Sequence, residues 1–221
     1  MSKIIPQLLP IEKSYTQKLD LVKTNVVKMF AHRGFINNEN IEKRTKKLID
    51  NHSEDNEYVL ELDNNTNVNS TISNKKIIIK ILNYKISSVN KSSEIAEFIT
   101  KYNNDYKFII VEAINSKSEK ILLSYQTDFE IFKFTELMIC IVEHILVPKH
   151  MILSQDETNQ VLQEYCARKR DMPFIMSNDP VARFYNMKPG EICKIIRPSI
   201  LTCDVPFYRI VIKTNIMRAK T

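Results

Sequence analysis

Apolar residues recur at steps of three and four near the start of the chain, and this spacing predicts an amphipathic helix over residues 13–33. The residues at these steps are Leu19, Val22, Val26, Met29 and Phe30. Gly34 directly afterwards predicts a left-handed end to the helix. A second helix is predicted over about 39–51, capped by the Asn37-Asn38 pair and carrying a run of basic residues on a solvated face.

Four short segments after these helices have strand patterns, because their apolar residues alternate or run continuously: residues 58–62, 76–82, 108–113 and 129–134. The run at 108–113 is typical of a strand buried on both faces. Helices are predicted over residues 94–103 and within 116–125, and the Asn-rich stretch 63–74 is predicted to be an exposed loop. Strands separated by helices indicate a mixed α/β domain.

The composition changes near His144, where asparagine and isoleucine become rarer and proline and arginine become more frequent. We therefore expect two domains, residues 1–143 and residues 144–221. The second domain opens with Ser154 and Glu157 in the S-x-x-E arrangement of a capping box, which predicts a helix through about residue 166.

The rest of the second domain has its own turn and strand signals. Asp179 can cap a helix, and Pro180 fits the first helical position because its missing N–H has no partner there. Gly190 follows a proline and suits a type II turn. Residues 192–197 and 207–213 then read as two strands that can pair. The expected domain is α+β, with a short mixed sheet and two helices.

Composition limits the classes of function. The hydrophobic fraction is 43%, but no apolar run approaches the roughly 18 residues of a membrane span, so we expect a soluble intracellular protein with no membrane partner. The N-terminal segment gains charge too quickly for a secretory signal. With 2 glycines in 221 residues, the glycine-rich phosphate-binding loops of P-loop and dinucleotide-binding enzymes are excluded.

Charge is distributed unevenly along the chain. Residues 1–143 hold 20 Lys and Arg against 19 Asp and Glu, whereas residues 144–221 hold 12 against 7. The basic residues of the second domain include Lys188, Lys194, Arg197 and Arg209. They can contact nucleic-acid phosphates or acidic residues of a protein partner, and the sequence leaves both alternatives open.

No catalytic or metal-binding set is evident. The four cysteines include no C-x-x-C pair, and Cys140 with His144 supplies only two ligands, so we expect no metal site and no cofactor. Glu112 is the only carboxylate that ends a buried-looking strand, and no second acid or nearby lysine accompanies it as a metal-dependent nuclease would require. A non-catalytic protein is expected.

Four segments of the second domain resemble, in order and spacing, the assembly domain of the fifth subunit common to the eukaryotic nuclear RNA polymerases, a domain that has a counterpart in archaeal RNA polymerases. They are HILVPKH (144–150), DPVARFY (179–185), PGEICKIIRPS (189–199) and YRIV (208–211). Residues 22–35 are more weakly similar to the first helix of the eukaryotic jaw domain. The segment NSKSEK (115–120) replaces a loop that in the family lies toward downstream DNA, and the chain runs past the family's usual end.

The resemblance implies a non-catalytic structural and assembly subunit of a multisubunit DNA-directed RNA polymerase, which supports transcription. The C-terminal domain would dock on the largest subunit, and the N-terminal domain would lie near downstream double-stranded DNA. The implied interface candidates are His144, Pro148, His150, Asp179, Pro180, Arg183, Gly190, Lys194, Arg197 and Arg209. Candidates close to DNA are Lys117 and Lys120.

Two other functions stay open at this point: a free-standing nucleic-acid-binding transcription factor and a metal-dependent nuclease. A cellular subunit would belong in the nucleus. The Asn-, Ile- and Lys-rich N-terminal domain is also compatible with the AT-rich genome of a large DNA virus, and a viral subunit would belong in the virion and the cytoplasmic virus factory.

Overall fold

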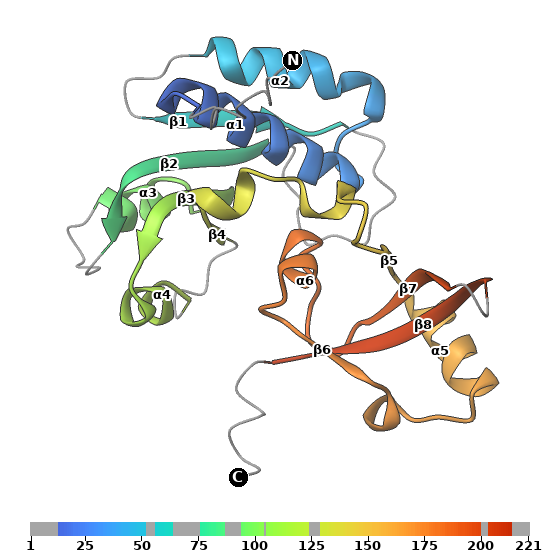
Figure 1. Ribbon diagram of the computed structural model, residues 1–221. Helices are drawn as coiled ribbons and strands as arrows, with labels where there is room; N and C mark the ends of the chain where they lie inside the picture. Colours follow the sequence, from blue (N-terminus) through green and yellow to red (C-terminus); the bar gives the residue numbers. More distant parts are fainter. Residues whose placement is uncertain are drawn as a thin grey trace, which may run out of the picture. The chain divides into compact units, whose positions relative to one another are not determined.

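The computed structural model describes residues 13–51, 56–63, 76–86, 94–103, 105–123, 129–199 and 203–213. The chain divides into two compact units, Met1–Ile139 and Cys140–Thr221, each with its own four-stranded sheet (Figure 1). The division falls just before His144, where the composition changes. None of the helices in these ranges combines the length and apolarity needed to cross a membrane.

The sheet of the first unit has the strand order β1-β2-β3-β4. Strand β1 (Glu57–Glu61) is antiparallel to β2 (Lys76–Ile86), and β3 (Tyr106–Ile114) and β4 (Phe129–Lys133) continue the sheet in parallel. The four predicted strands are confirmed, and so is the mixed α/β class.

Helices cover both faces of this sheet. Helices α1 (Tyr15–His32) and α2 (Ile41–Asp50) lie on one side of the strands in Figure 1, and α3 (Glu94–Lys101) and α4 (Ser116–Leu123) lie on the other. Helix α1 begins with a capping box, in which the N–H of Gln17 donates to Ser14 Oγ at 3.3 Å. It ends before Gly34, whose φ of 81° confirms the predicted left-handed stop.

The two central strands carry continuous apolar runs, residues 77–79 of β2 and 108–111 of β3, because both faces of the sheet are covered there. On one face Ile78 packs in a cluster with Phe98 of α3 and Leu122 of α4. On the other face, the ring of Phe108 lies edge-on to Phe30 of α1, with 5.4 Å between the ring centroids. The prediction of a strand over residues 108–113 that is buried on both faces is confirmed for residues 108–111, whereas Glu112 is exposed and Ala113 is half-buried.

The start of α2 differs from the prediction. Asn37 makes no side-chain cap hydrogen bond, and a short 3₁₀ turn, η1 (Asn38–Asn40), precedes the helix instead. The basic run is only partly solvated, because Arg44 contacts the carboxylates of Glu61 at 2.6 Å and Asp63 at 3.2 Å. These ion pairs connect α2 to the end of β1. The predicted loop beyond Asp63 lies outside the described residues.

The sheet of the second unit has the order β5-β7-β8-β6. Its strands are β5 (Lys149–Ile152), β6 (Phe174–Met176), β7 (Ile192–Ser199) and β8 (Cys203–Ile212). Strand β7 is antiparallel to β5 and β8, and β6 is parallel to β8. The predicted pair β7 and β8 is confirmed, whereas the short edge strands β5 and β6 carry too few residues to show a period.

Two helices flank this sheet, as predicted. Helix α5 (Gln155–Glu164) begins with the predicted capping box, in which Ser154 N–H donates to Glu157 Oε2 at 2.7 Å. Helix α6 (Pro180–Phe184) begins where Asp179 Oδ1 accepts from the N–H groups of Val181 at 2.8 Å and Ala182 at 3.4 Å. The short 3₁₀ turns η2 (Phe134–Leu137), η3 (Ile141–Glu143) and η4 (Lys169–Asp171) complete the described elements.

The core of the second unit is small and lies at one end of the sheet. Ala182 and Met187, from α6 and the loop after it, pack against Cys193 and Ile195 of β7 and Val211 of β8. Because α6 has only 5 residues, it covers only part of this sheet face.

Candidate protein interface

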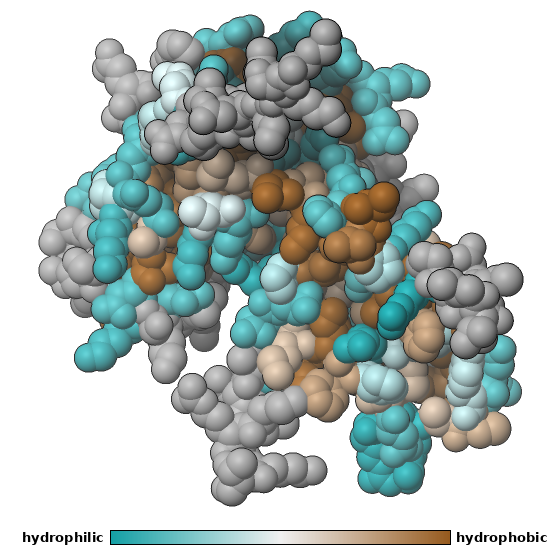
Figure 2. All heavy atoms as spheres, viewed as in Figure 1, coloured by the Kyte–Doolittle hydropathy of each residue, from teal (hydrophilic) through white to brown (hydrophobic). Residues whose placement is uncertain are grey.

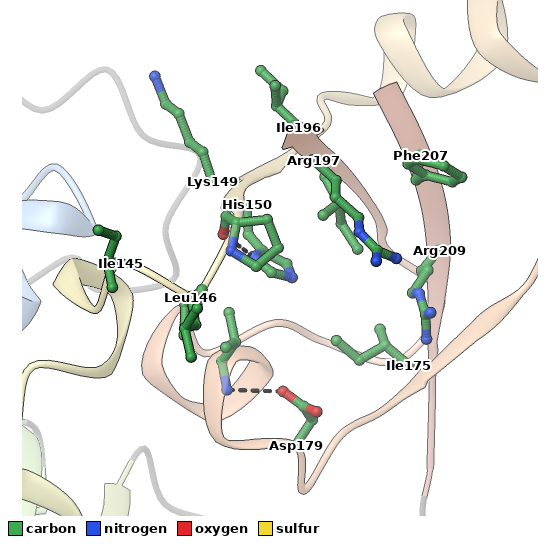
Figure 3. A pocket seen from close by; sticks show the side chains of 14 residues that line it. Ile145, Leu146, Lys149, His150, Ile175, Asp179, Ile196, Arg197, Phe207 and Arg209 are labelled. Carbon is green, nitrogen blue, oxygen red and sulfur yellow. Dashed lines mark hydrogen bonds between the residues drawn. The ribbon is translucent and has the colours of Figure 1, made fainter. Parts of the chain in front are cut away.

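An open groove of about 850 Å³ lies on the second unit, beside the part of the sheet that α6 leaves uncovered. The loop before β5 and the start of β5 form one wall, the start of α6 lies at the base, and β7 and β8 form the other wall. In Figure 3, Arg197 and Arg209 extend from neighbouring strands on the opposite side of the groove from Leu146 and His150.

Two large aliphatic side chains stand at the rim of this groove. The N–H of Val147 donates to the carbonyl of His144 at 2.9 Å and closes a tight turn, so Ile145 and Leu146 occupy its tip. Their side chains are 94% and 82% exposed. Polar residues and glycine usually occupy turn tips, so adjacent exposed aliphatic residues indicate a surface that another molecule covers. Figure 2 shows hydrophobic atoms open to view on this unit among hydrophilic ones.

The backbone around this turn is fixed by histidine side chains. The N–H of Leu146 donates to His144 Nδ1 at 3.2 Å, and this hydrogen bond stabilises the turn. His150 Nδ1 lies 2.7 Å from the carbonyl oxygen of Pro148. A carbonyl oxygen can only accept, so His150 Nδ1 is the donor in this contact.

The strand register explains which basic side chains reach the groove. Cys193 pairs with Arg209, Ile195 with Phe207 and Arg197 with Val205, so these side chains share one face of the β7–β8 pair. α6 covers the end of this face nearest Cys193, but Phe207 stays 50% exposed. The uncovered part of the face therefore carries an aromatic ring between two arginines.

Lys194 is on the opposite face of the sheet, because successive residues of a strand point to opposite sides. It pairs in register with Tyr208, whose ring packs against Tyr165 just beyond the end of α5, with 5.7 Å between the ring centroids. Hydrogen bonds at Ser154 and the charge of Lys194 together lower the pKa of the Glu157 carboxyl. Lys194 is thus associated with α5 and lies outside the groove.

Three other candidates lie on α6 or at the turn before β7 and do not line the groove. Pro180 occupies the first turn of α6 beside the Asp179 cap. Gly190 has a φ of 93°, which permits the turn into β7, and its N–H donates to the carbonyl of Val211 at 2.9 Å. Arg183 is half-buried in the last turn of α6, where a cation interacts favourably with the helix dipole.

Of the ten candidates from the sequence, the structure brings five together as groove-lining residues: Pro148, His150, Asp179, Arg197 and Arg209. His144 holds the neighbouring turn, and the other four lie elsewhere. Sequence reasoning did not single out Ile145, Leu146 and Phe207. The sequence does mark Ile145 and Leu146 as unusual, because an Ile-Leu pair just before Val-Pro fits neither the helical nor the alternating pattern of a buried segment.

The two lysines expected near DNA belong to α4 of the first unit. Lys117 is exposed in the first turn of that helix. The backbone of Lys120 is helical, but its side chain lies outside the described part of the structure.

Cys193 of β7 is a core residue. Cys193 is fully buried, and burial raises the pKa of its thiol above the usual value. A protonated thiol is a weak nucleophile, so Cys193 serves packing.

Comparison with known proteins identifies relatives of both units. The family described as RNA polymerase Rpb5, C-terminal domain, matches residues 139–211. An archaeal relative from Saccharolobus shibatae, DNA-directed RNA polymerase subunit Rpo5, is 51% identical over 69 residues, which are 31% of this chain and 82% of that protein. DNA-directed RNA polymerase subunit 5 of Acanthamoeba polyphaga mimivirus is 27% identical over 213 residues, 93% of this chain and 97% of the relative.

A eukaryotic relative matches part of the chain. The Dictyostelium discoideum protein DNA-directed RNA polymerases I, II, and III subunit rpabc1 is 40% identical over 84 residues, which are 38% of this chain and 40% of that protein. The residues that the family matches, 139–211, include all those that line the groove.

Proposed function

This chain belongs to the RNA polymerase subunit 5 family and is a structural subunit of a multisubunit RNA polymerase, and we propose that it is non-catalytic and docks on the largest subunit through the groove of its second unit. The exposed pair Ile145 and Leu146 carries the proposal. Burying one such side chain is worth about 2 kcal/mol, so covering both supplies a substantial part of a stable interface.

The side chains around the groove support a binding role over a catalytic one. The Cys193 thiol is buried and protonated, and His150 Nδ1 is engaged by a backbone carbonyl. Arg197 and Arg209 offer positive charge at an open surface, which suits recognition of a partner.

Purification of native complexes through the tagged full chain tests this proposal. Mass spectrometry should find the largest polymerase subunit in equal amount with this chain, together with other polymerase subunits. Recovery of the chain alone, from cells in which the polymerase is assembled, would contradict the proposal. A free-standing transcription factor would instead be recovered with DNA and without polymerase subunits.

The first unit is proposed to lie beside downstream DNA, with Lys117 and Lys120 of α4 nearest to it. Support comes from the relative that matches 93% of the chain and from the exposure of Lys117. Polymerase carrying Lys117→Ala and Lys120→Ala should hold a DNA template with a weaker dependence on salt, because each phosphate contact adds to that dependence. Unchanged salt dependence would remove this part of the proposal.

The location of the chain follows that of the enzyme it serves. With a cellular polymerase it belongs in the nucleus, and with a viral polymerase it belongs in the virion and the cytoplasmic virus factory. Relatives of both origins are found. Immunofluorescence with a polymerase-subunit marker distinguishes the two.

A further inference from the structure

The basic side chains of the groove have few partners among the residues that the structure describes. The described residues that line the groove include the cations Lys149, Arg197 and Arg209 but one carboxylate, Asp179. Asp179 Oδ1 already accepts two backbone hydrogen bonds as the cap of α6. The groove therefore presents an excess of positive charge to solvent.

The arginines of the groove differ from those of the first unit. Arg33 and Arg44 each contact a carboxylate within 2.8 Å. Among the described residues, the guanidinium of Arg209 donates only to the carbonyl oxygen of Phe174 at 3.3 Å, and the guanidinium of Arg197 makes neither a hydrogen bond nor an ion pair. An arginine whose guanidinium is bound to no anion is suited to bind one from a partner.

The strand register sets the spacing of the two charges. Arg209 pairs with Cys193, and Arg197 is four residues further along β7, so their backbones are about 13 Å apart at 3.3 Å per residue. Phe207 and Ile195 occupy the position between them on the same face. The face thus alternates positive, apolar and positive.

We propose, on the basis of the docking function above, that the groove binds a segment of a larger polymerase subunit in which carboxylates flank an apolar side chain. The carboxylates pair with Arg197 and Arg209, and the apolar side chain packs on Phe207. The exposed aliphatic pair at the rim favours a polypeptide over nucleic acid, because a phosphate backbone would leave Ile145 and Leu146 in water.

Photo-crosslinking within the intact complex identifies the occupant. The photo-reactive residue p-benzoylphenylalanine replaces Phe207 in the full chain, and the polymerase is purified and irradiated. The crosslinked peptide should come from a larger subunit and carry Asp or Glu on both sides of the crosslinked residue. A peptide without acidic residues, or a crosslink to nucleic acid, overturns the inference.

Charge reversal measures the contribution of the arginines. Arg197→Glu with Arg209→Glu should weaken binding of the chain to the polymerase depleted of it by 100-fold or more, and should flatten the salt dependence of binding. Arg170→Glu with Lys213→Glu changes the net charge equally at exposed sites outside the groove and should change binding less than threefold. Equal losses in the two double variants contradict the inference.

Charge exchange separates this inference from the docking proposal. Replacing the crosslinked carboxylates by arginine should restore binding of the Arg197→Glu, Arg209→Glu chain at least tenfold. If the reversed chain instead binds as the wild type does and the crosslink still leads to the largest subunit, docking stands and the acidic segment is wrong. A crosslink to an acidic segment of a subunit other than the largest would support binding of an acidic segment and contradict docking on the largest subunit.

Discussion

Arg33 at the end of α1 and Glu130 of β4 form a two-point ion pair, with Nη1–Oε1 at 2.7 Å and Nη2–Oε2 at 2.8 Å. Burial disfavours the charge, but the Glu130 carboxylate raises the pKa of the Arg33 guanidinium above its usual value. The hydroxyl of Tyr106 on β3 also donates to Glu130. The pair therefore connects a helix to two strands of the first unit.

Glu130→Gln should lower the free energy of unfolding of the first unit by about 3 kcal/mol or more, because it leaves the buried Arg33 without its counter-charge. Glu61→Gln removes a partner of Arg44 at a half-exposed position and should cost about 1 kcal/mol or less. Denaturant unfolding of the full chain, followed by circular dichroism, measures both. Equal losses would show that burial does not strengthen the Arg33 pair.

The carboxylate of Glu57 predicts a dependence of stability on pH. Burial raises its pKa, but hydrogen bonds from Tyr102, Lys101 and Lys80 outweigh burial and bring the pKa below the usual 4.5. A group with a lowered folded-state pKa stabilises the protein above its unfolded-state pKa and loses this effect as the pH falls through the folded-state value.

Glu57→Gln should therefore be less stable than the wild type at pH 7, and the difference should shrink as the pH falls below about 4.5. Urea unfolding of the two proteins between pH 7 and pH 3 gives the comparison. A difference that stays constant over this range would exclude the proposed ion pairing.

Asp179 can stabilise α6 through its capping oxygen or through its negative charge, and two substitutions separate these effects. Asp179→Asn keeps an oxygen that accepts the N–H groups of Val181 and Ala182, whereas Asp179→Ala removes the cap and should cost about 1 kcal/mol. Thermal unfolding should therefore rank the wild type and Asp179→Asn together, above Asp179→Ala. Similar destabilisation by both substitutions would assign the effect to the lost charge.

Gly190 is required for its backbone conformation. A Cβ added at this position would meet no heavy atom within 4 Å, so the strain of Gly190→Ala arises from the φ of 93° alone. The substitution should cost about 1–2 kcal/mol. The amide hydrogen of residue 190, which donates to the carbonyl of Val211, should then exchange faster with deuterium. The exchange rates of the α5 amides should not change and serve as the reference. An unchanged exchange rate would show that the turn tolerates a side chain.

Local chemistry explains which features could be predicted from the sequence. The capping box at Ser154 and Glu157 and the Asp179 cap depend on residues within three positions of one another, so their spacing is visible in the chain. Asn37 was wrongly predicted as a cap because Asp63, which accepts its N–H at 2.8 Å, is distant in sequence.

The groove could be predicted only in part. Alternation along β7 would have separated Lys194 from Arg197 once the strand was recognised, and this signal was present in the sequence. The exposure of Phe207 depends on how far the short helix α6 extends over the sheet, which is a property of packing between elements distant in the chain.

The most direct test of the central claim is recovery of the polymerase through chains altered at the turn tip. Full-length wild type and a variant with Ile145→Ser and Leu146→Ser are expressed with equal tags, and Val59→Ser in the first unit, 46% exposed, serves as the matched control. Wild type and control should recover equal amounts of the largest subunit, and the turn variant should recover at least tenfold less. Equal recovery by the turn variant, with the chain shown to be folded, would contradict docking through this groove.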